Sequence, residues 1–331
     1  MDIEKLYQMI PNETACRAFF EELIWPDGRF CPHCRCKRSY RIAGAYTRPG
    51  LYECADCKHQ FTVTTNTPMH STKLPLFKWL LAVYYIVNSS KGISSIYLAR
   101  LIGVHQSTAW KLGHAIRKMM QLWGENMIQL SGTIEMDEKY FGGKPRYQRG
   151  KTQKPGAHNK RSILIAVQRK GGVVPLHVAK VKNTTIMPVI DQFADPNAKL
   201  MTDKHHVFHQ AGKRFSSHES VWHFAKEFAR DDVHVNTAES FGSMMERMKI
   251  GVFHFISEKH LNRYLGELSF RWANRDPKET TTVSGKKKTI WTPKPILDQL
   301  KTLLQFAHGL KLHRSRKGGI IDINRSSLQL T

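Results

Sequence analysis

The fold class is best indicated by the stretch Thr133-Ile134-Glu135-Met136-Asp137-Glu138-Lys139-Tyr140-Phe141, which stops at Gly142-Gly143. Apolar and polar side chains alternate along it, and this period of two is typical of a half-buried β-strand. Two more strand-like segments follow at residues 162–168 and 174–181, separated by Gly171-Gly172. The pattern predicts three strands that meander through tight turns.

The segments after these strands alternate between helix and strand. Apolar side chains have helical spacing at residues 185–193, a further strand-like segment at 198–203 ends in Asp203, and helical spacing returns at 236–248. Strands alternating with helices indicate an α/β protein. Three antiparallel strands, a helix, a fourth strand and further helices predict a sheet of the ribonuclease-H type.

Three acidic residues fall at informative places on this predicted scaffold. Asp137 lies on the first strand, Asp203 ends the fourth strand, and Glu239 falls in the first turn of the later helix. Three carboxylates on adjacent elements can hold two Mg²⁺ ions about 4 Å apart, one at the attacking oxygen and one at the leaving oxygen. A single acidic residue is more often a solvated surface group, but both aspartates follow apolar strand residues, where an unpaired charge is costly. We therefore expect these carboxylates to form a catalytic metal site.

Four of the six cysteines form two C-x2-C pairs, Cys31 with Cys34 and Cys54 with Cys57. The 19 residues between the pairs (54 − 34 − 1) fall in the range of four-cysteine zinc ribbons. Redox-active dithiols and inert cysteines are the alternatives. We expect a structural Zn²⁺ held by the four thiolates, and we expect Cys16 to be a small core residue of an N-terminal helix.

Residues 93–116 have the pattern of a helix-turn-helix. A short helical segment ends at Gly103, and a second segment begins with polar side chains. In DNA-binding proteins of this kind the second helix enters the major groove with its first residues. Plain helical bundles also contain such pairs of helices, so the pattern gains weight from the basic charge of the chain. We expect four residues to face a DNA groove: Gln106, Ser107, Thr108 and Lys111.

The composition is strongly basic. The 331 residues include 51 Lys and Arg but 27 Asp and Glu, which gives a formal charge of +24. Nucleic acid is the polyanion that most often neutralises such a surplus. The sequence has no apolar run long enough for a membrane span and no secretory signal pattern, so we expect a cytoplasmic, DNA-associated protein without a membrane partner. Basic segments at 285–288 and 313–319 flank a helix predicted around residues 296–312.

Several motifs together resemble the IS1595-family (ISXO2-like) transposases of bacterial insertion sequences. Residues 135–144 (EMDEKYFGGK) are similar to the first catalytic block of the family, and residues 234–241 (HVNTAESF) are similar to the third. Residues 260–265 and 270–275 fit the closing helix, and the cysteine pairs with Thr67-Pro68 and Lys78-Trp79-Leu80 match the N-terminal module. The resemblance covers roughly residues 15–276.

The resemblance implies a ribonuclease-H-like catalytic core of the DDE type. Asp137 and Asp203 match the two metal-binding aspartates, and Glu239 matches the third acid. Asn236 is the alternative third residue, because it lies one helical turn earlier and some members use a non-acid there. The family usually has a basic residue seven positions after the glutamate, where this chain has Glu246 followed by Arg247. Either Arg247 takes over the DNA contact or activity is impaired.

The resemblance also implies the activity, which is transposition of an insertion element. With two Mg²⁺ or Mn²⁺ ions, a DDE transposase cuts a phosphodiester at each element end, and the freed 3′-OH attacks target DNA. The implied partner is double-stranded DNA, and holding two ends together implies a homo-oligomer. The alternatives are a DNA-binding regulator with an inert nuclease-like domain and a structure-specific nuclease.

The sequence divides into four predicted parts. The boundaries follow the change from cysteine motifs to helical spacing, then to strand spacing, and last to basic residues. The parts are a zinc ribbon with a short N-terminal helix at 1–70, a helical helix-turn-helix region at 71–128, a ribonuclease-H-like catalytic domain at 129–276 and a basic C-terminal extension at 277–331.

Overall fold

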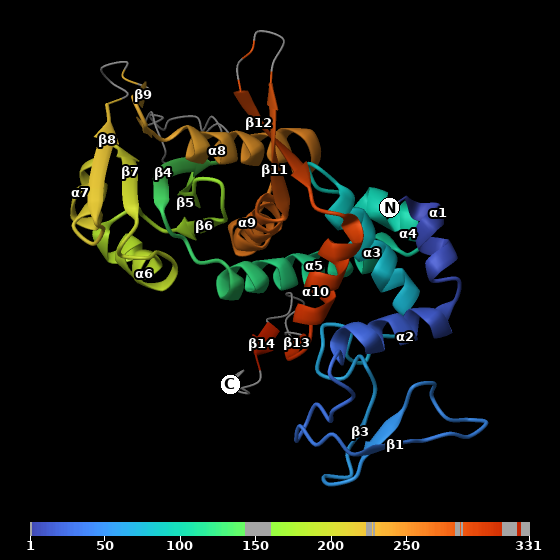
Figure 1. Ribbon diagram of the computed structural model, residues 1–331. Helices are drawn as coiled ribbons and strands as arrows, with labels where there is room; N and C mark the ends of the chain where they lie inside the picture. The colour runs from blue at the N-terminus through green and yellow to red at the C-terminus, as the bar shows by residue number, and fades with distance from the viewer. Residues whose placement is uncertain are drawn as a thin grey trace, which may run out of the picture. The chain divides into compact units, whose positions relative to one another are not determined.

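The chain forms two compact units (Figure 1). The first contains Met1–Met119 and Lys294–Thr331, and the second contains Met120–Pro293. The structure is a computed structural model that describes residues 2–142, 160–222, 227, 229–281, 285, 287–312 and 323–325. The predicted basic segment at 313–319 lies outside the described residues, as does Lys286 of the other basic segment. The four predicted parts of the chain remain a prediction.

The second unit contains a five-stranded sheet with the order β6-β5-β4-β7-β8. Its first three strands in the chain, β4 (Thr133–Phe141), β5 (Arg161–Gln168) and β6 (Val173–Val178), pair antiparallel. The other two, β7 (Lys199–Asp203) and β8 (Ser217–Val221), continue the sheet from β4 in parallel orientation. The four strands predicted from the sequence are confirmed, with small shifts of their ends.

The fifth strand, β8, has no counterpart in the sequence prediction. Its sequence Ser217-His218-Glu219-Ser220-Val221 contains one apolar side chain, that of Val221, which is fully buried. The strand lies at the edge of the sheet beside β7, so backbone pairing rather than apolar alternation defines it. Hydrophobic periodicity therefore could not detect it.

Helices cover both faces of the sheet. On one face, α6 (Asn183–Phe193) and α7 (His206–Gly212) share a core with the even-numbered β4 residues Ile134 and Met136. On the other face, α8 (Asn236–Met248) and α9 (Glu258–Ala273) share a core with Phe141. Side chains alternate between the two faces of a strand, so the odd-numbered side chains of β4 lie on the α8 side. The helices predicted at 185–193 and 236–248 are confirmed.

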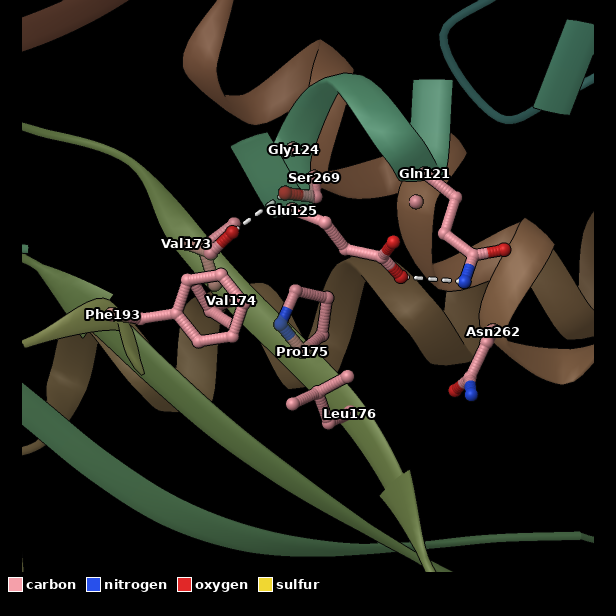
Figure 2. Close-up of a pocket in the computed structure, with 11 residues that line it drawn as sticks. Gln121, Gly124, Glu125, Val173, Val174, Pro175, Leu176, Phe193, Asn262 and Ser269 are labelled. Atoms are coloured by element: carbon pink, nitrogen blue, oxygen red, sulfur yellow. Dashed lines mark hydrogen bonds between the residues drawn. The ribbon is translucent and has the colours of Figure 1, made fainter. Parts of the chain in front are cut away.

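The helix α5 (Gln106–Met127) ends in the second unit, where its last turns line a small void together with β6 and α9 (Figure 2). The contact is close, because a Cβ added at Gly266 would lie 2.5 Å from the Cα of Gln121. The Ser269 hydroxyl donates a hydrogen bond to the carbonyl of Val173 at 2.6 Å (Figure 2). The void measures about 30 Å³, a space on the scale of single water molecules.

Two hairpins flank the helices of the α8 face. β9 (Ala229–Arg230) pairs with β10 (Val233–His234) just before α8 begins. β11 (Arg275–Thr281) follows α9 directly and pairs antiparallel with β12 (Lys287–Pro293). The first hairpin delivers the chain to the start of α8, and the second carries Arg275 and Trp291 to the same side of the unit.

The first unit combines a small sheet with helices. The sheet consists of β1 (Ser39–Arg41), β2 (Tyr52–Cys54) and β3 (Gln60–Phe61) in antiparallel order. The helices before α5 are α1 (Ile3–Met9), α2 (Glu13–Ile24), α3 (Leu76–Asn88) and α4 (Ser95–Ile102). Cys16 is fully buried in α2, which confirms its expected place in the core.

The C-terminal helix α10 (Ile296–Phe306) buries Leu300, Leu303 and Leu304 and packs against α2 and α3. It is shorter than the helix predicted around residues 296–312, and the predicted extent was wrong. Gly309 takes a φ of +83°, which ends helical geometry, and β13 (Leu310–Leu312) follows, paired with β14 (Ile323–Arg325). Among the described residues, none of the helices has the length and apolar character needed to cross a membrane.

Candidate functional site

Two of the predicted acids lie on neighbouring strands of the central sheet. β4 and β7 run parallel with Met136 opposite Thr202, and the same register continued by one residue brings Asp137 alongside Asp203. Met136 belongs to the core on the α6 side, so the next side chain, that of Asp137, lies on the α8 side. The sheet therefore holds two carboxyl groups on adjacent parallel strands, one in the middle of β4 and one at the end of β7.

The Asp137 carboxyl is in an electrostatically unfavourable position. Burial, the negative charge of Asp203 and, more weakly, the charge of Glu239 raise its pKa to about 6. The backbone N–H of Glu138 donates a hydrogen bond to Asp137 Oδ1 at 2.8 Å and, with Lys139, partly opposes this effect. Burial contributes most to the raised pKa, and the charges of Asp203 and Glu239 add to it, so a bound cation would favour the ionised Asp137 carboxylate.

The third acid, Glu239, lies in the first turn of α8 and is exposed to solvent. Asn236, the alternative third residue, is the first residue of the same helix and is also exposed. The two are three residues apart, so their side chains lie on neighbouring but distinct strips of the helix. Of this pair, Glu239 contributes to the pKa of Asp137 by its charge.

The start of α8 is held by a residue that we did not predict as functional, Glu135. Its side chain is completely buried two positions before Asp137, on the same face of β4. Its carboxylate accepts hydrogen bonds from the backbone N–H of Thr237 at 2.7 Å and of Ala238 at 3.1 Å, and from the Thr237 hydroxyl at 2.9 Å. The N-cap residue, Val235, has no side-chain acceptor. Glu135 thus caps α8 from a distant strand and complements the positive end of the helix dipole.

Arg169 completes this arrangement. Its Nε lies 2.7 Å from Glu135 Oε1, its Nη1 donates to Asp232 at 2.8 Å, and its Nη2 donates to the carbonyl of His234 at 3.0 Å. One guanidinium therefore joins the sheet, through Glu135, to the hairpin that leads into α8. The sequence carried a signal for Glu135, because it alternates with Asp137 in an apolar strand. The backbone that it caps, at Thr237, lies more than a hundred residues further along the chain, so the spacing could not reveal this role.

The four predicted zinc ligands come together in the first unit. Cys31 Sγ lies 3.6 Å from Cys57 Sγ, Cys34 Sγ lies 3.5 Å from Cys54 Sγ, and all four sulfurs lie within 4.8 Å of one another. Tetrahedral zinc with Zn–S bonds of about 2.3 Å requires sulfur separations of roughly 3.8 Å. The geometry fits a structural Zn²⁺, and Cys36 is not part of the group.

The three carboxylates are arranged more openly than the cysteines. Among the described residues, the cysteine group is the one set of three or more potential ligands whose atoms all fall within 4.8 Å. Two ions about 4 Å apart need carboxylates spread around both of them, so a wider spacing suits a two-metal site better than a single-ion site. The donors are oxygen atoms, which Mg²⁺ and Mn²⁺ prefer.

The predicted DNA-contacting residues lie at the start of α5. Ser94 caps α4 through the N–H of Tyr97, and Gly103 ends it in a left-handed conformation with a φ of +63°. Gln106 Nε2 then donates to Ser95 Oγ at 2.8 Å, which ties the two helices together. Gln106, Ser107 and Lys111 are exposed, and Thr108 is half-buried.

The unusual acid Glu246 has a partner within its own helix turn. Its Oε2 lies 2.6 Å from Lys249 Nζ, which also donates to the carbonyl of Gly142 at 3.3 Å. Arg247 is exposed and lines a different region, a pocket beside α8. Glu246 and Arg247 therefore face different surroundings.

Two family models match the chain. The model of the ISXO2-like transposase domain matches residues 129–273, and the model of the transposase zinc-ribbon domain matches residues 11–60. The chain belongs to the IS1595 family of ISXO2-like transposases. It is also similar to the uncharacterized protein in transposable element ISH50 of Halobacterium salinarum, at 26% identity over 277 residues, which span 78% of this chain and 90% of the relative.

These comparisons confirm the resemblance that the motifs indicated. Family membership identifies the chain as a transposase, and therefore as a DNA-processing enzyme that binds DNA. The match of the zinc-ribbon model and the converging cysteines together support a structural Zn²⁺.

Proposed function

We propose that the chain cleaves DNA phosphodiesters at the ends of an insertion element and joins the freed 3′-OH ends to target DNA. In this proposal Asp137, Asp203 and Glu239 hold two Mg²⁺ or Mn²⁺ ions. The observation that carries it is the parallel pairing of β4 with β7, whose register brings Asp137 beside Asp203 on the face covered by α8. The pKa of Asp137, raised to about 6 first by burial and then by the charges of Asp203 and Glu239, supports the same assignment, because a bound cation would stabilise the ionised carboxyl group.

The proposed scaffold is a ribonuclease-H-like core of the DDE type. Support comes from the strand order β6-β5-β4-β7-β8, in which three antiparallel strands precede two parallel ones. Helices on both faces, with α8 carrying the last acid, agree with this topology.

Glu239 is proposed as the third metal ligand in preference to Asn236. Its charge acts on Asp137, whereas Asn236 is uncharged and lines the pocket beside α8. A carboxylate also binds a hard cation more strongly than an amide does.

The proposed mechanism divides the work among this chain's own residues. When bound, the two ions activate the attacking oxygen and stabilise the leaving oxygen of an in-line displacement, which exchanges one P–O bond for another. The backbone N–H of Glu138 fixes one oxygen of the Asp137 carboxylate. Glu135 and Arg169 fix the start of α8, so that Glu239 keeps its place relative to the strands. The residues supply oriented oxygen ligands, and none of them forms a covalent bond with the DNA.

We also propose that α4 and α5 form a helix-turn-helix that presents Gln106, Ser107, Thr108 and Lys111 to DNA. The left-handed Gly103 and the Gln106–Ser95 hydrogen bond support a fixed angle between the helices, and the exposed start of α5 supports access to a groove. Because two element ends must be held together, the proposed working form is a homo-oligomer on double-stranded DNA.

The test is strand cleavage and joining on a duplex that carries the element's own end sequence, with Mg²⁺ present. Asp137→Asn and Asp203→Asn are expected to abolish both reactions and to leave DNA binding intact. Cleavage retained by either variant would remove the assignment. If the unmodified chain cuts but never joins, it is a nuclease, and if it binds without cutting, it is a regulator. Glu239→Gln and Asn236→Ala then separate the two candidate third residues, because we expect activity to be lost only in the former.

A further inference from the structure

We propose that a basic pocket beside α8 binds one unpaired nucleotide of the DNA strand, with the phosphate held by Lys170, Arg247 and Arg275 and the base stacked on Trp291. The pocket lies wholly in the second unit and has a volume of about 320 Å³. Pockets for small ligands begin at about 300 Å³, so the space suits a single nucleotide rather than a base pair. This inference rests on the proposed DNA chemistry and adds a second subsite to it.

The charge of the pocket matches a phosphate. Lys170 lines it from the turn between β5 and β6, Arg247 from α8 and Arg275 from β11, and no acidic residue is among the described residues of the lining. The exposed polar side chains of Asn236 and Ser240 add hydrogen-bonding groups from α8. Arg and Lys side chains together with neutral polar groups are the usual contacts of DNA phosphates.

Arg275 is the part of the pocket that most needs a ligand. Its guanidinium lies 3.9 Å from the ring centroid of Trp272 and 5.1 Å from that of Trp291, and its Nε donates to the carbonyl of Trp272 at 3.0 Å. Its Nη2 is buried and has no hydrogen-bond partner within the described part of the chain. Burial lowers the pKa of Arg275 to about 10, so the group is still charged at neutral pH. A buried cationic donor left unsatisfied is costly, and a phosphate oxygen would satisfy it.

Trp291 supplies the surface for a base. It is half-buried on β12 and lines the pocket, whereas the preceding residue, Ile290, is not among the lining residues and is 44% exposed. Nucleic-acid bases stack on tryptophan rings with little dependence on sequence. A base inside a duplex is already stacked and paired, so a nucleotide must be unpaired to enter.

The pocket and the acidic site share one helix. Asn236, Ser240, Met244 and Arg247 recur at helical spacing and form the pocket side of α8. Glu239 directly precedes Ser240, and Gly242 packs near Lys139 of β4 on the side of the acids. A DNA strand bound at the three acids therefore has to cross the width of one helix, about 10 Å, to bring a nearby nucleotide into the pocket.

The test measures binding of the full-length, zinc-loaded chain to two labelled DNAs without Mg²⁺, so that cleavage does not contribute. One is a blunt duplex and the other is the same duplex with a short single-stranded end. Trp291→Ala and Arg275→Gln are each expected to weaken binding of the single-stranded-end DNA about tenfold and to leave blunt-duplex binding within about twofold. Trp291→Phe keeps an aromatic face and should restore most of the loss.

Ile290→Ala is the matched control, because it alters the same strand of the hairpin without altering the pocket. The inference is overturned if the pocket variants weaken both DNAs equally, which would indicate general charge or misfolding, or if they weaken neither. Intact β11–β12 pairing in the variants, followed by amide exchange, separates these outcomes. Since binding alone is measured, a failure of the proposed cleavage chemistry would leave this result unaffected.

Discussion

The two candidate metal sites of the chain are built in opposite ways. The four cysteines lie within one short segment, from Cys31 to Cys57, and Cys54 among them ends strand β2 of the small sheet. The three acids come from two strands and a helix, and Asp137 and Glu239 are 102 positions apart (239 − 137). A local site can be specified by residue spacing, but a dispersed one exists only if the tertiary structure holds its parts in place.

The ion pairs near the two sites show the same contrast. Arg38 and Asp56 beside the cysteines lie 2.7 Å apart, with side chains 78% and 48% exposed. Arg169 and Glu135 near the acids also lie 2.7 Å apart, but their side chains are 16% and 0% exposed. Equal distances therefore do not mean equal importance, because water screens the first pair and not the second.

The largest expected effect is that of Cys31→Ser. If the metal organises the local site, loss of one thiolate removes the Zn²⁺ and with it the fold of the ribbon, since zinc binding in such modules contributes about 10–16 kcal/mol. Zinc content by mass spectrometry and amide exchange in β1–β3 measure this. Cys36→Ser is the control, because Cys36 is outside the ligand group. Full zinc occupancy in Cys31→Ser would contradict the assignment.

Glu135→Gln should have the next largest effect. The substitution keeps the shape but removes the buried one of the two carboxylates that pair with Arg169, leaving the exposed Asp232, and it weakens the cap of α8. Breaking a buried pair costs about 3–5 kcal/mol. Amide exchange at Thr237 and Ala238 reports the opening of the helix. Strand cleavage should fall with it, while binding of DNA through the first unit should not.

Asp232→Asn is the matched control for this prediction. Asp232 bonds the same guanidinium, but its side chain is 83% exposed. We expect little change in stability or activity. If Asp232→Asn were as damaging as Glu135→Gln, Arg169 rather than the buried cap would be what holds α8.

The sequence predicted the local features of the molecule well and the distant ones poorly. Spacing alone identified the cysteine site and the strands that carry Asp137 and Asp203. It missed β8, whose polar sequence has no strand periodicity, and it missed the role of Glu135. That role depends on α8 starting directly above β4, a contact that no local pattern encodes. The sequence named the three acids as a candidate site, which stays a prediction, and it did not name the residues that hold them in place.

A smaller effect is expected from the pH dependence of the acid site. Because the native state raises the pKa of Asp137 from 3.8 to about 6, it binds this proton more tightly than the unfolded state does. Stability from this group is therefore present at low pH and is lost as pH rises from about 4 to about 6. Asp137→Asn cannot ionise, so it should be more stable than the unmodified chain above pH 6 by at most about 3 kcal/mol.

The measurement is amide exchange in β4 as a function of pH, in Mg²⁺-free buffer without a chelator so that the ribbon keeps its Zn²⁺. The advantage of Asp137→Asn should disappear near pH 4. At neutral pH, excess Mg²⁺ should make the unmodified chain the more stable of the two, because the ion stabilises only the chain that has the Asp137 carboxylate. A stability advantage that is independent of pH would mean that the native fold does not raise the pKa of the Asp137 carboxyl.

The smallest effect is expected from Asp56→Asn, which tests whether the cysteine site also depends on an ion pair outside its ligands. The neighbouring Cys36 thiol and, second to it, the Arg38 guanidinium lower the pKa of Asp56, but the Arg38–Asp56 pair is exposed. If the metal alone organises the ribbon, the variant should retain its zinc, and its amide exchange in β1–β3 should match that of the unmodified chain. A clear loss of zinc affinity would show that a surface ion pair helps to hold the cysteine turns. The two sites would then differ in degree rather than in kind, since both would depend on side-chain pairs outside the ligand set.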